Sequence, residues 1–187
     1  YSPEAVAGFG VASRIESLFL VVIMGLSSIM GPFVGQNWGA KNYSRVFSGI
    51  DISLKFILYW GLITTTLLWL FADNLTGLFS DDPVVIKSAS HYLMILPFSY
   101  LFLGTIMVTS SAANGMGTPL PSLVMSFLRL IGFYIPFIFI LLEFMDVSGI
   151  YLAAALANIF VGLGAFAWYT RLKKVYLNDT SAVLNKN

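Results

Sequence analysis

Five runs of apolar residues, separated by short polar segments, dominate the chain. A helix of about 20 residues rises about 30 Å, which matches the hydrocarbon core of a bilayer. The pattern therefore predicts an all-α, polytopic membrane helix bundle with five transmembrane helices, surrounded by a lipid bilayer. The runs cover residues 15–35, 53–72, 92–113, 122–142 and 149–169.

The first run ends in a segment marked by glycines. Gly31, Gly35 and Gly39 recur every four residues and share one face of a helix. Small residues at this spacing let the backbone of a second helix come close, so we expect tight helix packing here. Pro32 lacks a backbone N–H, and we also expect a bend near it.

Turn signals lie between and inside the runs. The Asp-Asp-Pro of residues 81–83 is typical of a helix start, and we expect a short surface helix that continues into the third span. Pro97 and Pro136 fall inside spans, where each can free backbone carbonyls toward a cavity or cause a static bend. Gly115 and Gly117 lie between spans and indicate a turn.

Composition supports a membrane protein and excludes several other classes. Hydrophobic residues make up 58% of the chain and charged residues 10%, compared with about 25% charged in soluble domains. A formal net charge of +1 does not favour nucleic acid as a partner. The sequence has no cysteine, so it contains neither a disulfide nor a cysteine-based zinc site.

No arrangement of catalytic residues stands out, and we expect neither an enzyme nor a metal site. The chain has no Ser, His and Asp in a triad order, no close carboxylate pair within a span and no phosphate-binding loop. His91 is the sole histidine, and either fills an interfacial polar role or senses pH.

Lysine and arginine favour one side of the predicted membrane. Positive residues are retained in the cytoplasm, so we expect a cytoplasmic C-terminus in a bacterial-type inner membrane and an external segment at residues 73–87. Tyr1 would then lie outside, and an upstream part would add an odd number of spans if the complete protein starts in the cytoplasm. The cytoplasmic side holds Lys41, Arg45, Lys55, Arg129, Arg171, Lys173, Lys174 and Lys186, against Arg14 and Lys87 on the other.

Several segments resemble one transporter family. Residues 5–16 (Ala-Val-Ala-Gly-Phe-Gly-Val-Ala-Ser-Arg-Ile-Glu) and residues 31–42, with their Val-Gly-Gln-Asn-x-Gly-Ala core, resemble the eighth span of multidrug and toxic compound extrusion (MATE) transporters and the loop after it. Residues 78–83, 114–121 and 149–150 match at the expected distances. The family-motif and packing positions are Gly31, Pro32, Gly35, Gln36, Asn37, Gly39, Ala40, Gly115, Gly117 and Pro121.

The resemblance implies a twelve-helix transporter made of two six-helix lobes. Residues 1–175 would form a partial C-terminal lobe, and residues 176–187 a polar cytoplasmic tail. The missing N-terminal lobe of the same protein would be the chain's partner. Rocking of the two lobes would expose a central cavity to either side of the membrane in turn.

The implied activity is secondary antiport, in which small organic cations leave the cell while sodium ions or protons enter. No cofactor is implied beyond the coupling ion. A lipid-linked oligosaccharide flippase is the alternative, since that group shares the fold but favours a basic cavity. A purely structural membrane subunit is a further alternative.

Charged residues inside spans are costly, so Glu16 and Arg14 are the first candidates for ion or substrate binding. Two positions apart, they point to different sides of a helix, and each either meets another helix or stays at the outer interface. Family members place an acid about four positions after a Tyr in the tenth span. The comparable residues here are Tyr100 and Gly104, so the coupling acid is either Glu16 or a residue of the other lobe.

Polar residues of the third run are further candidates. Thr105, Thr109 and Asn114 share a helical face, and either bind substrate or form hydrogen bonds between helices.

Three charges in later helices have structural interpretations. Arg129 either reaches the cytoplasmic surface with its long side chain or pairs with an acid from another helix. Asp51 and Lys55 are four residues apart with the acid first, so we expect an ion pair along one helix.

Overall fold

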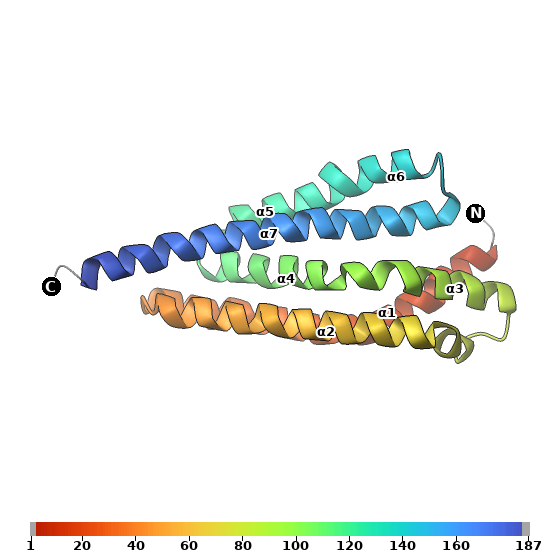
Figure 1. The fold of residues 1–187 in the computed structure, drawn as a ribbon, viewed down its shortest axis with the longest axis horizontal. Helices are drawn as coiled ribbons and strands as arrows, with labels where there is room; N and C mark the ends of the chain where they lie inside the picture. The colour runs from red at the N-terminus through yellow and green to blue at the C-terminus, as the bar shows by residue number, and fades with distance from the viewer. Residues whose placement is uncertain (1–2, 185–187) are drawn as a thin grey trace.

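The chain forms an elongated bundle of helices (Figure 1). The computed structural model describes residues 3–184, with side chains up to residue 177, and contains no strand within that range. Helices η1 and η2 are a 3₁₀ turn and a π-helical segment. The elements are α1 (Pro3–Gly39), α2 (Tyr43–Gly77), α3 (Pro83–Ile95), η1 (Leu96–Ser99), α4 (Tyr100–Gly115), α5 (Leu120–Phe127), η2 (Leu128–Tyr134), α6 (Ile135–Leu141) and α7 (Asp146–Leu184).

Five segments of the described chain are long and apolar enough to cross a membrane. They are α1, α2, the continuous stretch Pro83–Gly115, the stretch Leu120–Leu141, and α7. The all-α fold with five transmembrane helices is therefore confirmed. The helices extend beyond the apolar runs because helical hydrogen bonds are internal to the chain and continue into the polar zone.

Helix α4 lies at the centre of the bundle. It contacts α1 and α2 on one side and α7 and α5 on the other (Figure 1). Buried apolar side chains gather in one cluster around Tyr92 and Tyr100 and in another around Phe47 and Tyr169. The two clusters tie α1, α2 and α7 to the continuous span of α3, η1 and α4.

The start of α3 has the geometry that its sequence predicts. Asp82 is the N-cap, and its Oδ1 accepts a hydrogen bond of 2.8 Å from the backbone N–H of Val84. Pro83 occupies the first turn, where its missing N–H costs no intrahelical bond. Helix α3 then leads through η1 into α4, so the surface helix does run into the third span.

Irregular helix marks both prolines inside spans. Pro97 lies in η1, and Pro136 is the second residue of α6, which follows the π-helical segment η2. Near Pro97, Thr65 and Trp69 of α2 donate hydrogen bonds of 2.9 Å to the carbonyls of Pro97 and Met94. Side chains of α2 therefore satisfy these two carbonyls, which are not free to line a cavity. Pro32 lies within α1, which continues unbroken to Gly39.

Two helices end in the same type of turn. At the end of α4, Thr118 and Gly117 donate backbone hydrogen bonds of 3.0 Å to Ala113 and Asn114, with Gly117 at a φ of 77°. This is a Schellman motif, which confirms the turn expected at Gly117. At the end of α1, Asn42 bonds Asn37 in the same pattern, but the left-handed position holds Lys41 at a φ of 57°.

The glycines of α1 pack against the end of α4. A Cβ added to Gly35 would lie 3.3 Å from the carbonyl oxygen of Gly115, and one added to Gly115 would lie 2.5 Å from that of Gly31. The expected close approach therefore holds for Gly31 and Gly35. It does not extend to Gly39, where an added Cβ meets nothing within 4 Å, because α4 has already ended.

The C-terminal segment is helical for longer than a separate tail would be. Helix α7 continues to Leu184, so the stretch 176–187 begins inside it. Residues 185–187 lie outside the described residues.

Candidate functional site

The carboxylate of Glu16 lies inside the helix bundle. Helix α1 packs against α3 and α4, and this packing brings Tyr92 to Glu16 from 76 positions along the chain. The Tyr92 hydroxyl donates a hydrogen bond of 2.5 Å to Oε2 of Glu16. Glu16 thus meets another helix, and its partner there is a neutral phenol.

Two more tyrosines surround this pair. The ring of Tyr151 meets that of Tyr92 edge to face, with centroids 4.8 Å apart. Tyr100 is 1% exposed and lies beside Glu16. The hydroxyls of Tyr100 and Tyr151 are buried and make no well-formed hydrogen bond to the described residues. These two hydroxyls are therefore still able to form hydrogen bonds with a bound group.

A cavity of about 200 Å³ opens beside Glu16, between α1, α4, η2 and α7. Arg129 and Tyr134 line it from η2, and Asn158 lines it from α7. Glu16 and Arg129 share this cavity without forming an ion pair within 4.0 Å. Arg129 is thus placed at the level of Glu16, rather than with the cytoplasmic lysines among which the charge count put it.

Asn158 was not identified as a candidate from the sequence. It is 5% exposed, and its Nδ2 donates a hydrogen bond of 3.0 Å to Oγ of Ser99, which in turn bonds the carbonyl of Leu96. This chain of bonds links α7 to η1 beside the cavity. The available signal was an amide side chain in the middle of an apolar run.

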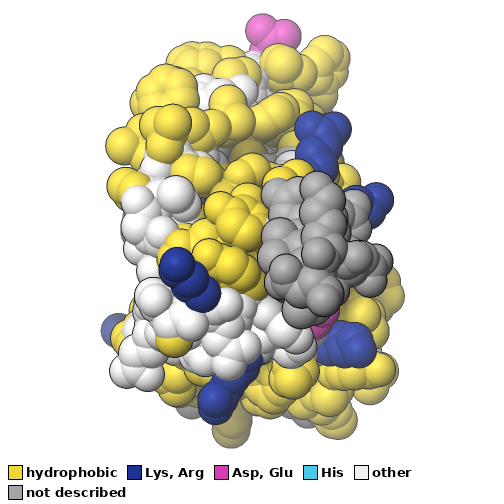
Figure 2. Space-filling model, turned by 90° about the vertical axis from the view of Figure 1, so that its left-hand side faces the viewer, with side chains coloured by type: hydrophobic (Ala, Val, Ile, Leu, Met, Phe, Trp, Pro, Cys, Tyr) yellow, Lys and Arg dark blue, Asp and Glu magenta, His cyan; other side chains and the backbone are white. Residues whose placement is uncertain are grey.

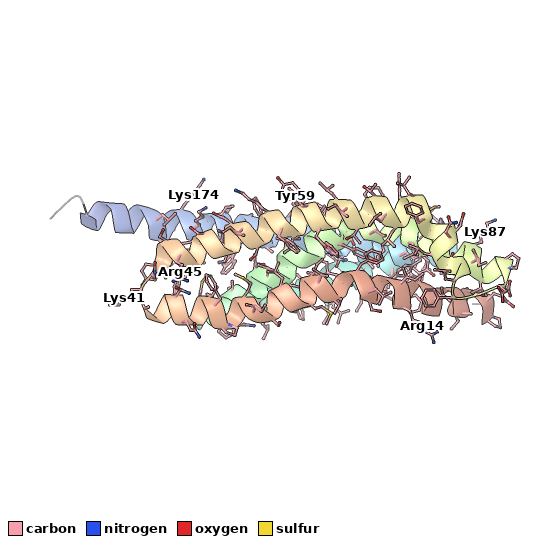
Figure 3. All side chains as sticks on the ribbon, turned by 90° about the horizontal axis from the view of Figure 1, so that it is seen from below. Arg14, Lys41, Arg45, Tyr59, Lys87 and Lys174 are labelled. Atoms are coloured by element: carbon pink, nitrogen blue, oxygen red, sulfur yellow. The ribbon has the colours of Figure 1, made fainter. Side chains whose placement is uncertain are left out.

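The other predicted site residues lie apart from this cavity. Arg14 is exposed at one end of the bundle, and Figure 3 shows its side chain pointing outward. Thr105 and Thr109 are buried and bond the carbonyls of Leu101 and Thr105 within their own helix, at 2.8 and 2.7 Å. Asn114 is exposed at the end of α4.

Gly104 is confined by its neighbours. A Cβ added there would lie 2.7 Å from Cγ2 of Ile57 and 3.2 Å from Cγ2 of Ile23. A carboxylate side chain has no space at this position. The absence of an acid four residues after Tyr100 is therefore matched by close packing around Gly104.

A second polar cluster joins α2 to α7. The carboxylate of Asp51 accepts a hydrogen bond of 2.6 Å from the Tyr169 hydroxyl and forms an ion pair of 2.5 Å with Lys173. The expected pair between Asp51 and Lys55 is wrong, since the one ion pair found among the described side chains is Asp51–Lys173. Helix α7 supplies a closer partner than the next turn of α2.

Basic residues gather at one end of the bundle. Figure 3 places Lys41, Arg45 and Lys174 at one end and Arg14 and Lys87 at the other. Figure 2 views the first end directly and shows several Lys and Arg side chains around it. Among the described residues no group of three His, Asp or Glu side chains could hold a metal ion.

Comparisons with known proteins agree with this architecture. The MatE family model matches residues 1–140. A protein of Shewanella oneidensis named FAD transporter is 36% identical over 163 residues, covering 87% of this chain and 36% of that protein. The probable multidrug resistance protein YpnP of Bacillus subtilis is 27% identical, covering 90% of this chain and 38% of its own length.

A solved structure shows the same arrangement of helices. The Vibrio cholerae MATE transporter VcmN in its bent form is 29% identical and superposes with a TM-score of 0.85, covering 94% of this chain and 41% of that one. The chain spans well under half the length of each of these proteins. With a family model matching most of its residues and a MATE transporter sharing its fold, the chain belongs to the MatE family.

Proposed function

We propose that the complete protein containing this chain is a secondary active antiporter that exports small organic cations in exchange for sodium ions or protons. The two lobes would rock around a central cavity, with the described helices forming most of one lobe. Membership of the MatE family supports the efflux function. The observation that carries the cation-linked part is the position of the half-buried Glu16 on an open cavity between α1, α4, η2 and α7.

The chemistry of Glu16 suits a cation or a proton. Its described hydrogen-bond partner is a neutral hydroxyl, and no described Lys or Arg lies within 4.0 Å of its carboxylate. A carboxylate without a fixed counter-ion inside a membrane bundle is costly, so such residues mark ion and substrate sites. The neighbouring tyrosine rings add a cation–π surface worth about 0.5–2 kcal/mol per contact.

The packing of α4 supports Glu16 as the coupling acid of this lobe. Close packing around Gly104 disfavours an acid at that position of α4. Glu16 is then the candidate for ion coupling within this lobe, and any further coupling acid lies in the part of the protein outside this chain.

A second candidate function is export of flavin adenine dinucleotide. Arg129 adds a positive guanidinium to the same cavity, which suits an anionic substrate. The relative from Shewanella oneidensis is named FAD transporter. A cavity bearing both charges fits either substrate class, and transport measurements separate them.

The test is efflux by cells carrying the full-length gene. Ethidium efflux is measured under an imposed sodium gradient and then under a proton gradient, and export of FAD is measured from the same cells. We expect ethidium efflux under at least one gradient. Gln can still accept the Tyr92 hydrogen bond but carries no negative charge for a cation or a proton. Because an interaction with a charged partner is worth about 1.5–3 kcal/mol, Glu16→Gln should lower the rate by about ten-fold or more.

Glu143→Gln is the matched control, because Glu143 is exposed near the end of α6 and lines none of the cavities described above. It should leave efflux unchanged. If a correctly inserted protein exported neither substrate, the exporter function would be refuted. FAD export without ethidium efflux would show that the substrate is FAD and not an organic cation.

A further inference from the structure

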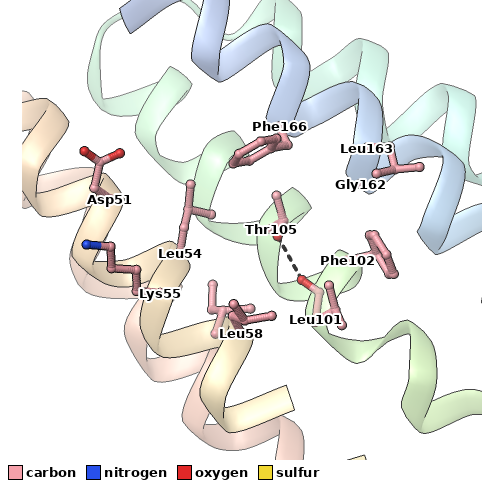
Figure 4. Close-up of a pocket in the computed structure, with 11 residues that line it drawn as sticks. Asp51, Leu54, Lys55, Leu58, Leu101, Phe102, Thr105, Gly162, Leu163 and Phe166 are labelled. Carbon is pink, nitrogen blue, oxygen red and sulfur yellow. Dashed lines mark hydrogen bonds between the residues drawn. The ribbon is translucent and has the colours of Figure 1, made fainter. Parts of the chain in front are cut away.

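A groove runs between α2 and α7 on the side of the bundle away from Glu16. Its volume is about 520 Å³, and Figure 4 shows that α4 forms its floor. The walls are apolar and partly exposed, with Leu58 of α2 at 44%, and Leu163 and Phe166 of α7 at 53% and 50%. An apolar, partly exposed cleft in membrane-spanning helices suits a hydrocarbon chain.

The floor of the groove offers a ligand no unpaired polar group. Gly162 of α7 approaches α4 so closely that an added Cβ would lie 2.6 Å from Cβ of Phe102. The single hydroxyl on the floor, that of Thr105, donates a hydrogen bond of 2.8 Å to the carbonyl of Leu101 (Figure 4). A polar ligand would find no free partner there, so the lower part of the groove suits an apolar one.

Positive charge is concentrated at one end of the groove. Lys55 lines the groove itself, and Lys174 lines an adjoining cavity of about 410 Å³ that shares Asp51 with it. Asp51 is neutralised by Lys173. Lys55 and Lys174 are exposed and form no ion pair with the described residues. Two positive charges at this end are therefore available to an anion.

The groove and the Glu16 cavity lie on different sides of α4. On α4, Leu101, Phe102 and Thr105 face the groove, whereas Leu103 lines the cavity. At 100° per residue these positions are on opposite sides of the helix. Charges inside a membrane face a protein interior or water, so the side with Glu16 and Arg129 is directed at the rest of the transporter and the groove side at lipid.

We propose that the groove between α2 and α7 binds an anionic phospholipid, with the phosphate group at Lys55 and Lys174 and one acyl chain along Leu58, Leu163 and Phe166. Basic pockets between membrane helices hold acidic lipid headgroups through charge attraction and hydrogen bonds to phosphate. The apolar depth of the groove positions the chain, and the lysines at its end select the headgroup.

The proposal is tested by lipid binding to the full-length protein. Native mass spectrometry of the detergent-solubilised protein, titrated with phosphatidylglycerol or with phosphatidylcholine of the same acyl chains, gives the two affinities. Phosphatidylglycerol should bind more tightly, and Lys55→Gln combined with Lys174→Gln should weaken it by about 30-fold, since each lysine at a membrane surface contributes about five-fold. Phosphatidylcholine binding should stay unchanged.

Lys87→Gln is the matched control, because Lys87 is at the opposite end of the bundle (Figure 3). It should leave both affinities unchanged. Equal binding of the two lipids, or unchanged phosphatidylglycerol binding in the double variant, would overturn the proposal. So would failure of a diazirine-bearing phospholipid, photolysed in the membrane, to label the groove at Leu163 or Phe166, since that result would show the groove covered by another part of the transporter.

Discussion

Asp51 holds α2 and α7 together through both oxygens of its carboxylate. Oδ1 accepts from the Tyr169 hydroxyl and Oδ2 pairs with Lys173, whose side chain is 32% exposed. Pairs exposed to this degree contribute little more than about 1 kcal/mol. In a double-mutant cycle on the thermal unfolding of the full-length protein, Asp51→Asn and Lys173→Gln should show a coupling energy of about 0.5–1 kcal/mol.

Lys55 supplies the comparison for this cycle. It is four residues from Asp51 on the same helix but forms no ion pair with it. The coupling between Asp51→Asn and Lys55→Gln should therefore be close to zero. A larger coupling to Lys55 than to Lys173 would contradict the pairing across helices.

The sequence identified the charged site residue but not its partners. Glu16 stands out as an acid inside an apolar run, whereas Tyr92 is 76 positions away and becomes its partner only through the packing of α1 on α3. Thr105 and Thr109 were expected either to bind substrate or to bond between helices, yet each hydroxyl bonds a carbonyl one turn earlier, an option that any helical Thr has. Asn158 is marked in the sequence by an amide within an apolar run, but its bond to Ser99 depends on the packing of α7 on η1.

At the scale of helices, a close backbone contact joins α1 to the end of α4. Gly115→Ala would place a methyl group 2.5 Å from the carbonyl oxygen of Gly31, and a backbone carbonyl cannot turn aside as a side chain can. The free energy of unfolding should fall by about 1–3 kcal/mol, the usual cost of overpacking. Thermal melting of the full-length protein measures the change.

Gly39→Ala is the control within the same glycine series. An added methyl there meets nothing within 4 Å. Since alanine favours helix over glycine by about 1 kcal/mol, stability should stay equal or rise. If both variants melted at the wild-type temperature, the contact between α1 and α4 would be looser than the structure describes.

The helices themselves were largely predictable, because five apolar runs of bilayer length can be satisfied only by spanning helices. The cap at Asp82 and the irregular turns near Pro97 and Pro136 were also local signals. What each break does was not predictable. The carbonyls near Pro97 are bonded by Thr65 and Trp69 of α2, and only the packing of that helix brings them there.

At the scale of the whole molecule, the bundle has one face suited to lipid and one suited to protein. The stretch Leu120–Leu141 is the least buried of the five spans. Only 6% of the residues in its apolar 18-residue window are buried, compared with 50% for Pro83–Gly115. It borders the cavity of Glu16 and Arg129. With the chain covering 36–41% of the proteins compared above, this is the face where we place the remaining part of the transporter.

The orientation of the bundle in the membrane is the property that the charge distribution predicts. Lys41, Arg45 and Lys174 lie at one end, which the preference for cytoplasmic positive charge places inside the cell (Figure 3). Asn42 and Asn74 form a matched pair of exposed, uncharged positions, between α1 and α2 and near the end of α2. Each is changed to Cys in an otherwise cysteine-free full-length protein. A membrane-impermeant maleimide added to intact cells should label Asn74→Cys at once and Asn42→Cys only after permeabilisation. The reverse labelling would place the C-terminus outside the cell. Because the groove lysines lie toward the same end, a lipid bound there would then not come from the cytoplasmic leaflet.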